Sequence, residues 1–334
     1  MIKLDLVTGF LGSGKTTFLK NYAAHLVGTG QRIAILENDY GAINVDMMLL
    51  KGLESEKCDL EMVVGGNDAD CHRRRFKSKL IALGMLGYDR VLVEPSGIYD
   101  VDEFFDVLHE DPIDRWYEPG SVIAVVDAGM EKDLSRDSRY VLASETVDAG
   151  ILVMSRTQMY GQEAVDRTLK MINDSIKEFG GKRTFSKEKN VLAMDWKTFS
   201  EDEYRRLENA SCEMHDLVKI LSMDDNNFTS LFYMDVEGSR EEIVSQIRKL
   251  FTEERAGHVF RVKGFLKNSD GGYDELNATR ERIECVPVKE GQEVLIVIGE
   301  DLQPDVIAAY FTFRHGTGRQ LLDDAAMQAL LQKS

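Results

Sequence analysis

The sequence lacks the features that mark secreted and membrane proteins. Its four cysteines include no C-x-x-C pair and lie far apart, at Cys58, Cys71, Cys212 and Cys285. That spacing argues against a disulfide framework and for a reducing compartment. No apolar run approaches the ~18 residues needed to cross a bilayer. An apolar strand is expected from residue 2, which leaves no room for a signal peptide. We therefore expect a cytoplasmic protein with no membrane partner.

Positive charge is also scarce. The 41 Lys and Arg residues face 58 Asp and Glu residues, which gives a net charge of −17. Because such a field repels phosphate backbones, we expect no general binding of nucleic acids or of anionic membranes. The 43% hydrophobic and 30% charged residues are ordinary for a soluble protein, and a length of 334 residues allows two domains with a core each.

The most specific pattern is G-F-L-G-S-G-K-T-T at residues 9–17, which matches G-x-x-x-x-G-K-T. A β-rich segment precedes it, and residues 18–27, without Pro or Gly, suit a helix. In that context the pattern indicates phosphate binding, because the glycines allow a tight loop whose N–H groups point at one anion. Lys15 supplies a charge for the β- and γ-phosphates, and the Thr16 hydroxyl is placed to bind Mg²⁺. We predict that a nucleoside triphosphate is bound by Gly12, Ser13, Gly14, Lys15, Thr16 and Thr17.

Apolar runs separated by helical stretches predict the fold. The runs lie at 32–36, 90–93, 122–126, 151–154 and 191–194, and they are continuous rather than alternating, which is typical of a parallel sheet covered on both faces. A polar stretch at 196–227 marks a soft boundary. Beyond it the order strand, helix, three strands, helix indicates a small α+β domain. We therefore predict an α/β P-loop domain at 1–225, with a mostly parallel sheet and helices on both faces, and an α+β domain at 228–334. A last helix is expected at 323–332.

Ligands of such sheets bind at the carboxyl ends of the strands, which directs attention to the residues that follow the predicted strands. Glu94 is expected to hold the water shell of Mg²⁺ or to orient the attacking water, with a helix cap as the alternative. The Gly97 N–H could meet a γ-phosphate. Asp127 could contact the nucleotide or be simply solvated. Asp46, with Asp39, lies in a segment that could form a loop ordered by the γ-phosphate, and a plain loop is the alternative.

The segment at 65–72 places two carboxylates, a thiol and an imidazole within five residues, namely Asp68, Asp70, Cys71 and His72. Thiolate and imidazole suit Zn²⁺ and related metals such as Co²⁺, and carboxylates can complete a site. A single thiol is a weak signal, so a solvated loop remains open. The basic run at 73–79 is expected to be a helix surface paired with local acids.

Four motifs carry a family resemblance: the loop at 9–17, E-N-D-Y-G-A-I-N-V-D at 37–46, V-E-P-S-G at 93–97 and V-V-D-A at 125–128. Together with F-R-V-K-G-F at 260–265, they resemble the CobW-type P-loop GTPases. The resemblance implies Mg²⁺-dependent hydrolysis of GTP, coupled to delivery of a metal ion or metallocofactor to a client metalloprotein. It also implies a metal-side role for Glu37.

The chain departs from the family pattern at three places. The C-x-C-C metal motif falls within 67–71, where only Cys71 supplies a thiol. Ala42 replaces the second acidic residue of the switch loop. The base-reading N-K-x-D appears as Ser155-Arg156-Thr157-Gln158. Arg156 and Gln158 remain candidate nucleotide contacts, because Gln can donate and accept hydrogen bonds to a purine, but the preference for GTP over ATP is left open.

Two other function classes stay open. One is a nucleotide-gated adaptor that hydrolyses little and carries no metal, which the eroded cysteine and base-reading motifs favour. The other is a small-molecule or protein kinase, for which Arg73 to Arg75 are weak candidate lid residues. The sequence indicates neither the client protein nor the oligomeric state.

Overall fold

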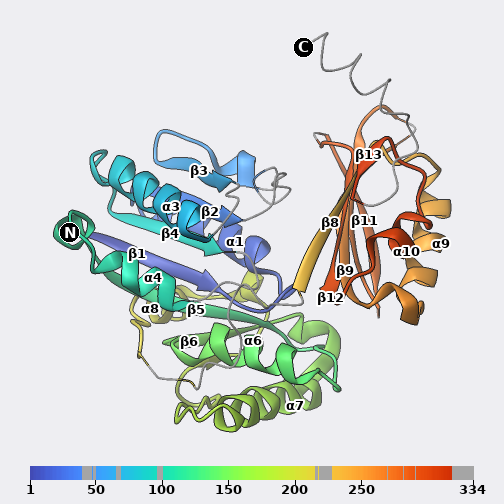
Figure 1. Cartoon of the computed structure of the whole chain (residues 1–334). Helices are drawn as coiled ribbons and strands as arrows, with labels where there is room; N and C mark the ends of the chain where they lie inside the picture. Colours follow the sequence, from blue (N-terminus) through green and yellow to red (C-terminus); the bar gives the residue numbers. More distant parts are fainter. Residues whose placement is uncertain are drawn as a thin grey trace. The chain divides into compact units, whose positions relative to one another are not determined.

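The structure is a computed structural model that describes residues 1–39, 47, 50–64, 69–95, 101–214, 217, 228–268, 270–280, 282–289 and 291–317. The chain divides into two compact units, Met1–Asp225 and Asn226–Ser334 (Figure 1). The helix expected at 323–332 lies outside the described residues, and so do Asp46, Asp68 and Gly97. No helix in the described ranges is long and apolar enough to cross a membrane.

The first unit is built on a seven-stranded sheet in the order β3-β2-β4-β1-β5-β6-β7. Every pairing between these strands is parallel, which confirms the predicted parallel sheet. The strands are β1 (Ile2–Thr8), β2 (Ile33–Asp39), β3 (Cys58–Val64), β4 (Arg90–Pro95), β5 (Tyr117–Asp127), β6 (Ile151–Ser155) and β7 (Val191–Leu192). The sequence analysis did not predict β3, whose Asp59 and Glu61 interrupt its apolar residues at the edge of the sheet.

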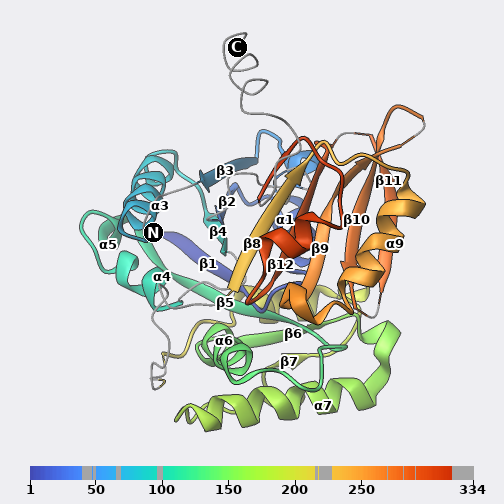
Figure 2. The same cartoon turned by 45° about the vertical axis from the view of Figure 1, so that its right-hand side comes forward.

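Helices cover both faces of this sheet (Figures 1 and 2). They are α1 (Lys15–Gly28), α3 (Ala69–Gly84), α4 (Val101–Leu108), α5 (Ile113–Trp116), α6 (Arg136–Val147), α7 (Thr157–Glu178) and α8 (Glu201–Glu208). Phe18 of α1 and Leu207 of α8 pack with Val7 of β1 in one buried cluster. Since side chains alternate along a strand, Leu4 and Leu6 face the other side, and both are fully buried there. Burial on both faces explains the continuous apolar runs.

The second unit holds a six-stranded sheet in the order β11-β10-β9-β12-β8-β13, with antiparallel pairings. Its elements are β8 (Phe228–Met234), α9 (Arg240–Leu250), β9 (His258–Lys267), β10 (Tyr273–Thr279), β11 (Ile283–Val288), β12 (Val294–Glu300), α10 (Pro304–Ala308) and β13 (His315–Gly316). Ser239 and Glu242 form a capping box that starts α9. Ile243 and Ile247 of α9 pack on Val262 and Val297 of the sheet, as an α+β domain requires.

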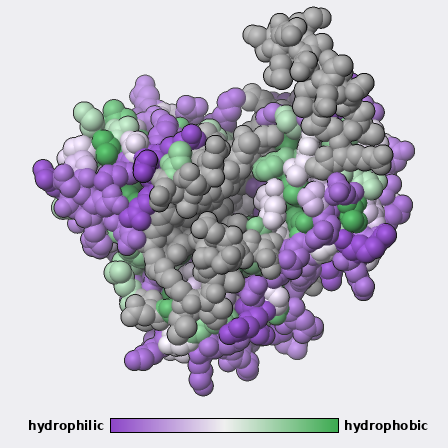
Figure 3. Space-filling model, in the orientation of Figure 1, coloured by the Kyte–Doolittle hydropathy of each residue, from purple (hydrophilic) through white to green (hydrophobic). Residues whose placement is uncertain are grey.

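Two details of this unit differ from the prediction. In the described residues, four strands rather than three lie between α9 and α10, because the sequence did not predict β10. Its sequence Y-D-E-L-N-A-T carries mostly polar residues, and Leu276 and Ala278 alone supply buried apolar side chains. The last helix of the predicted order strand, helix, three strands, helix was expected to span 302–311 and is limited to α10, which begins with Pro304 at a position that needs no N–H donor. The described surface in Figure 3 is mostly hydrophilic, with smaller hydrophobic patches between.

Candidate functional site

The loop between β1 and α1 has the geometry that its glycines predict. Gly9, Gly12 and Gly14 all have positive φ, at 136°, 78° and 96°, a region that side chains with a Cβ rarely adopt. A Cβ on Gly9 would also collide with the carbonyl oxygen of Val125 in β5. The loop is therefore wound tightly against the sheet, and α1 starts at its end with unsatisfied N–H groups that suit an anion.

Two side chains of this loop are suited to hold a phosphate. Lys15 is only 8% exposed, and its Nζ donates to the Gly9 carbonyl at 2.7 Å, so its charge rests on the inner side of the loop. Ser13 is 1% exposed, and its hydroxyl makes no hydrogen bond to any residue that the structure describes. Thr17 is exposed. A buried donor with no acceptor in the described part of the chain, next to a buried ammonium, is an arrangement that a phosphate oxygen would satisfy.

Side-chain oxygen atoms that could bind a metal ion lie beside the loop, near the carboxyl ends of β2 and β4. The Thr16 hydroxyl donates to Glu94 Oε1 at 2.7 Å. Glu37 lies in register with Glu94 on the neighbouring strand, and both carboxyl groups are buried. Since Glu94 and the Pro95 that follows it both belong to β4, Glu94 does not stand at a cap position directly before a helix. Hydroxyl and carboxylate oxygens are the ligands that a hard cation such as Mg²⁺ prefers.

Arg156 ties the loop to the next two strands. Its guanidinium forms an ion pair with Asp127 at the end of β5 and donates to the Gly12 carbonyl at 3.2 Å. Asp127 also accepts from the Gly129 N–H at 2.8 Å, so its carboxylate is held in place rather than simply solvated. Gln158, in the first turn of α7, is exposed. Of the two candidate base-side residues, only Arg156 therefore contacts the phosphate loop directly.

The sequence analysis missed a large aromatic residue beside the loop. It treated 196–227 as a polar stretch that marks a soft boundary, with loop or helix surface expected at 197–208 and 224–227. Trp196, however, packs edge-to-face on Phe18, with ring centroids 5.8 Å apart. The Trp196 ring also lies 3.5 Å from where a Cβ on Gly14 would stand. With Phe199, Tyr204 and the buried Leu207, it joins the core around α1. The sequence signal that could have predicted this packing is the recurrence of apolar residues among many polar ones.

The predicted metal segment is only partly described. Cys71 and His72 lie in the first turn of α3, where Cys71 is half-buried and His72 is fully buried. The solvated-loop alternative is therefore wrong for these two residues. The side chain of Asp70 is outside the described part, as is Asp68. Among the described side chains, no group of three His, Cys, Asp or Glu residues could hold a metal ion.

The basic run of α3 is paired with acidic neighbours, as expected. Arg73 contacts Glu110 at 2.7 Å and Asp106 at 3.5 Å, and Lys77 contacts Glu110 at 2.5 Å. Hydrogen bonds from Lys77 and Arg73 lower the pKa of Glu110. These ion pairs connect α3 to Asp106 of α4 and to Glu110, which follows α4. Arg73 therefore has a structural role in this contact.

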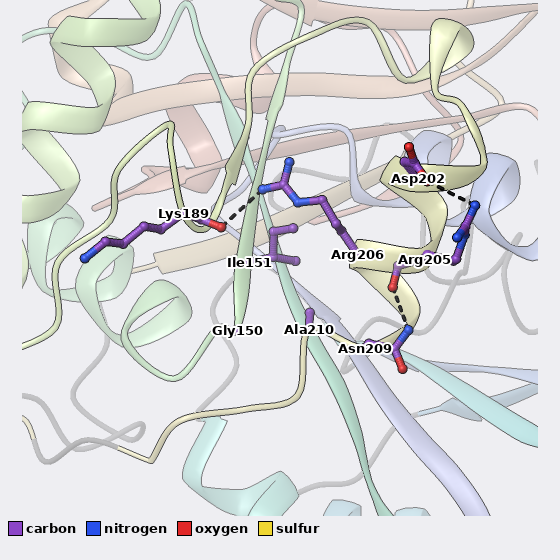
Figure 4. Close-up of a pocket in the computed structure, with 8 residues that line it drawn as sticks. All are labelled: Gly150, Ile151, Lys189, Asp202, Arg205, Arg206, Asn209 and Ala210. Atoms are coloured by element: carbon purple, nitrogen blue, oxygen red, sulfur yellow. Dashed lines mark hydrogen bonds and ion pairs between the residues drawn. The ribbon is translucent and has the colours of Figure 1, made fainter.

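A cavity of about 560 Å³ lies elsewhere in the first unit, near the start of β6 (Figure 4). It is lined by Gly150, Ile151, Lys189, Asp202, Arg205, Arg206, Asn209 and Ala210. Arg205 pairs with Asp202 at 3.0 Å, and Arg206 donates to the Lys189 carbonyl at 3.2 Å. Figure 4 shows the Lys189 side chain directed away from both arginines. The cavity contains none of the predicted site residues, and its cations do not converge on a common point.

Comparison with known proteins agrees with the fold and the loop. The zinc chaperone YjiA of Escherichia coli (strain K12) is 28% identical over 185 residues, which cover 52% of this chain and 55% of YjiA. This match thus spans about half the length of that relative. Zinc-regulated GTPase metalloprotein activator 1 of Schizosaccharomyces pombe is 20% identical over 340 residues, covering 92% of this chain and 81% of that protein.

Among solved structures, Zn(II)-bound YjiA GTPase from E. coli aligns with 92% of this chain and 97% of its own, at 19% identity. Its TM-score of 0.36 is too low to support an argument about function. The profile described as "CobW/HypB/UreG, nucleotide-binding domain" matches residues 4–183. That match covers more than half of the 334 residues and includes β1, the phosphate loop, Glu94 and Arg156. The chain belongs to the CobW/HypB/UreG family.

Proposed function

We propose that this protein is a Mg²⁺-dependent nucleoside triphosphatase, with GTP as the expected substrate, that acts as a metallochaperone for a client metalloprotein. The observation that carries the proposal is the hydrogen bond from Thr16 to Glu94, 2.7 Å long, beside the buried Lys15. It joins the loop that would hold the phosphates to the acid that would serve the metal ion or the water.

Each residue of this arrangement has a defined role in the proposal. Lys15 moves its ammonium from the Gly9 carbonyl to the β- and γ-phosphates. Thr16, Glu94 and Glu37 would hold Mg²⁺ directly or through its water shell, and the ion would neutralise charge on the phosphate oxygens. Glu94 would orient the attacking water, whose oxygen bonds to the γ-phosphorus while the bond from that phosphorus to the β–γ bridging oxygen breaks. Nucleoside diphosphate leaves, and the protons of the water go to the released phosphate and to solvent.

The base-side assignment rests on Arg156 and Gln158. Arg156 holds the Gly12 carbonyl and Asp127 together, and its position at the carboxyl end of β6 is one where a nucleotide would lie. The name of the relative zinc-regulated GTPase metalloprotein activator 1 favours GTP. Gln158 lacks the negative charge of an aspartate, so ATP is retained as an alternative substrate in the test.

The cargo assignment rests on Cys71 and His72, with Asp68 and Asp70 as further ligands. A thiolate and an imidazole suit Zn²⁺ or Co²⁺, and the relatives named as zinc chaperones favour Zn²⁺. Cys71 and His72 lie in the first turn of α3, the next described helix after β3 along the chain, and β3 pairs in parallel with β2, which carries Glu37. The proposed cargo site and the proposed nucleotide site therefore share an edge of the sheet.

Release of inorganic phosphate from GTP and from ATP, with and without Mg²⁺, tests this function. We expect Mg²⁺-dependent release from the intact chain. Lys15→Ala should abolish it, because the substitution removes the phosphate-side charge. Glu94→Gln should reduce kcat by about 100-fold, the scale of one positioned acid–base group. Tight nucleotide binding without any release would favour the adaptor, which the single cysteine of the metal segment and the uncharged Gln158 also favour.

A further inference from the structure

The mechanism above leaves one buried acid beside the phosphate loop without a role. Glu145 lies near the end of α6 and is 1% exposed. Its Oε2 accepts from the Gly9 N–H at 3.1 Å and also from the Thr8 hydroxyl. These contacts join residues that are 136 and 137 positions apart in the chain. A helix remote in sequence therefore holds the first residue of the loop.

Gly9 is fixed from three sides by three different elements. Glu145 of α6 accepts from its N–H. Lys15 of α1 donates to its carbonyl at 2.7 Å. The Val125 carbonyl of β5 lies so close to its α-carbon that no Cβ could fit. The N–H and the carbonyl of one residue thus connect the Glu145 carboxylate to the Lys15 ammonium.

Loss of the acceptor at Glu145 would affect Lys15 through this residue. The Gly9 N–H is enclosed by the loop and the sheet, and a buried N–H without a partner is unfavourable. Gly9 tolerates a wide range of φ, so the Thr8–Gly9 peptide can rotate to recover a partner. Because that rotation changes φ of Gly9, it also turns the adjoining Gly9–Phe10 peptide, whose carbonyl is the resting acceptor of Lys15.

We propose that Glu145 is a positioning residue of the phosphate loop, which fixes Gly9 and thereby sets where the Lys15 ammonium rests before nucleotide binds. This inference rests on the proposed nucleotide binding. The role needs an acceptor oxygen at this point, and it does not need the negative charge. The amide oxygen of Gln could accept from both donors, so Glu145→Gln should preserve the loop and Glu145→Ala should not.

The test measures the Kd of Mg²⁺–GTP for the full chain by titration calorimetry. We expect Glu145→Ala to raise Kd by about 10-fold, the scale of one lost hydrogen bond to a charged group. Glu145→Gln should stay within about 3-fold of the parent chain. Thr8→Val, which removes the second donor and leaves Gly9 held, should weaken binding by about 3-fold.

Thr146→Val is the matched control. Thr146 follows Glu145 in α6, is fully buried, and donates only to carbonyls of its own helix, Leu142 at 2.7 Å and Ala143 at 3.3 Å. The substitution should lower the melting temperature, because it buries a methyl group where a hydroxyl was bonded, yet leave Kd within about 2-fold. A general weakening of α6 would move Kd in both variants.

The outcomes separate this inference from the proposed function. If the parent chain binds no nucleotide and Lys15→Ala makes no difference, the proposed function fails. If the parent chain binds, Lys15→Ala does not, and both Glu145→Ala and Thr8→Val bind like the parent, the role of Glu145 is overturned. Glu145→Gln as weak as Glu145→Ala would equally overturn a role through the acceptor oxygen. Should Glu145→Ala fail to fold, the Thr8→Val and Glu145→Gln results still decide.

Discussion

At the scale of single residues, the phosphate loop is held by side chains that donate hydrogen bonds to its main-chain carbonyls. Lys15 donates to the Gly9 carbonyl and Arg156 donates to the Gly12 carbonyl. Both cations therefore lie at the loop before any anion is present, which lowers the entropy lost when a phosphate binds. Thr16 differs from these two, because its hydroxyl points to the Glu94 carboxylate.

Substitution of Thr16 tests whether its hydroxyl contributes to the proposed Mg²⁺ site. Thr16→Val keeps the shape of the side chain and removes the hydroxyl, so we expect the Mg²⁺ concentration for half-maximal phosphate release to rise by about 10-fold. Thr16→Ser keeps the hydroxyl and should behave like the parent chain. Lys20→Ala, at an exposed position of α1, is the control for this helix. An unchanged Mg²⁺ dependence in Thr16→Val would remove Thr16 from the metal site.

At the scale of elements, a buried ion pair connects the central strands of the first unit. Arg90 at the start of β4 contacts both oxygens of Asp5 in β1, at 2.7 and 2.6 Å. The same carboxyl group accepts from the Ser121 N–H of β5 and from Tyr22 of α1. Asp5 is fully buried and Arg90 is 3% exposed. One carboxylate thus aligns three strands and the helix that follows the phosphate loop.

This pair gives a prediction about stability and pH. Burial raises the pKa of Asp5, and the Arg90 charge opposes that rise. Arg90→Met should reduce the free energy of unfolding by about 3–5 kcal/mol near neutral pH, because a buried carboxylate is left without its partner. Without Arg90 the folded-state pKa rises further above its unfolded value. The folded variant then takes up a proton as the pH falls, before the unfolded chain does.

The deficit of Arg90→Met should therefore shrink between about pH 8 and about pH 5. Urea unfolding of the parent chain and the variant at both values measures it. The double variant Asp5→Asn with Arg90→Met has no carboxyl group to titrate at this position, so its deficit should be the same at both values. A deficit in the single variant that grows as the pH falls would contradict this account of Asp5.

Trp196 allows a test of how the loop is packed. Its ring lies against Gly14 and Phe18, whereas the other tryptophan, Trp116, lies against Gly84 at the end of α3. In a Trp116→Phe background, we expect Mg²⁺–GTP to change the tryptophan emission, because ordering of the loop alters the surroundings of the ring. Trp196→Phe should lose that signal while it keeps nucleotide binding. No change of emission at saturating nucleotide would separate Trp196 from the loop.

The sequence predicted those elements whose own pattern is strong. Local sequence patterns predict the glycine-rich loop, the buried strands and the helix α9. Glycines indicate the loop, continuous apolar runs indicate strands buried on both faces, and amphipathic spacing indicates the helix. β10 was missed because its sequence is mostly polar, and Trp196 was missed because its partner Phe18 comes from another part of the chain. Glu145 had no signal at all. A glutamate in a helix that mixes polar and apolar residues is expected at the surface, and only the fold brings the Glu145 carboxylate to Gly9.

At the scale of the whole molecule, the family match covers residues 4–183 and therefore lies within the first of the two units. The second unit, Asn226–Ser334, has its own core built on α9 and a six-stranded sheet. The proposed chemistry belongs to the first unit, where the phosphate loop and the segment with Cys71 and His72 both lie. The central claim is that these two sites are energetically linked.

Cys71 is the residue through which the proposed cargo site can be changed without altering the phosphate loop. Cys71→Ser should weaken binding of Zn²⁺ by at least about 10-fold, because a hydroxyl is a poor ligand for this metal compared with a thiolate. Binding of GTP in the absence of Zn²⁺ should stay as in the parent chain. Cys212→Ser, another half-buried cysteine of the first unit, is the matched control. Equal Zn²⁺ affinity in the parent chain and both variants would remove Cys71 from the site.

The most direct test of the central claim is the Zn²⁺ affinity of the intact chain, measured by competition with a chelator, without nucleotide and with saturating Mg²⁺–GTP. The account predicts that nucleotide changes this affinity by about 5- to 150-fold, and that Zn²⁺ changes the affinity for GTP by the same factor, since coupling between two sites is reciprocal. The claim would be contradicted if the parent chain binds GTP, the Lys15→Ala variant does not, and the Zn²⁺ affinity of the parent chain is the same with and without Mg²⁺–GTP.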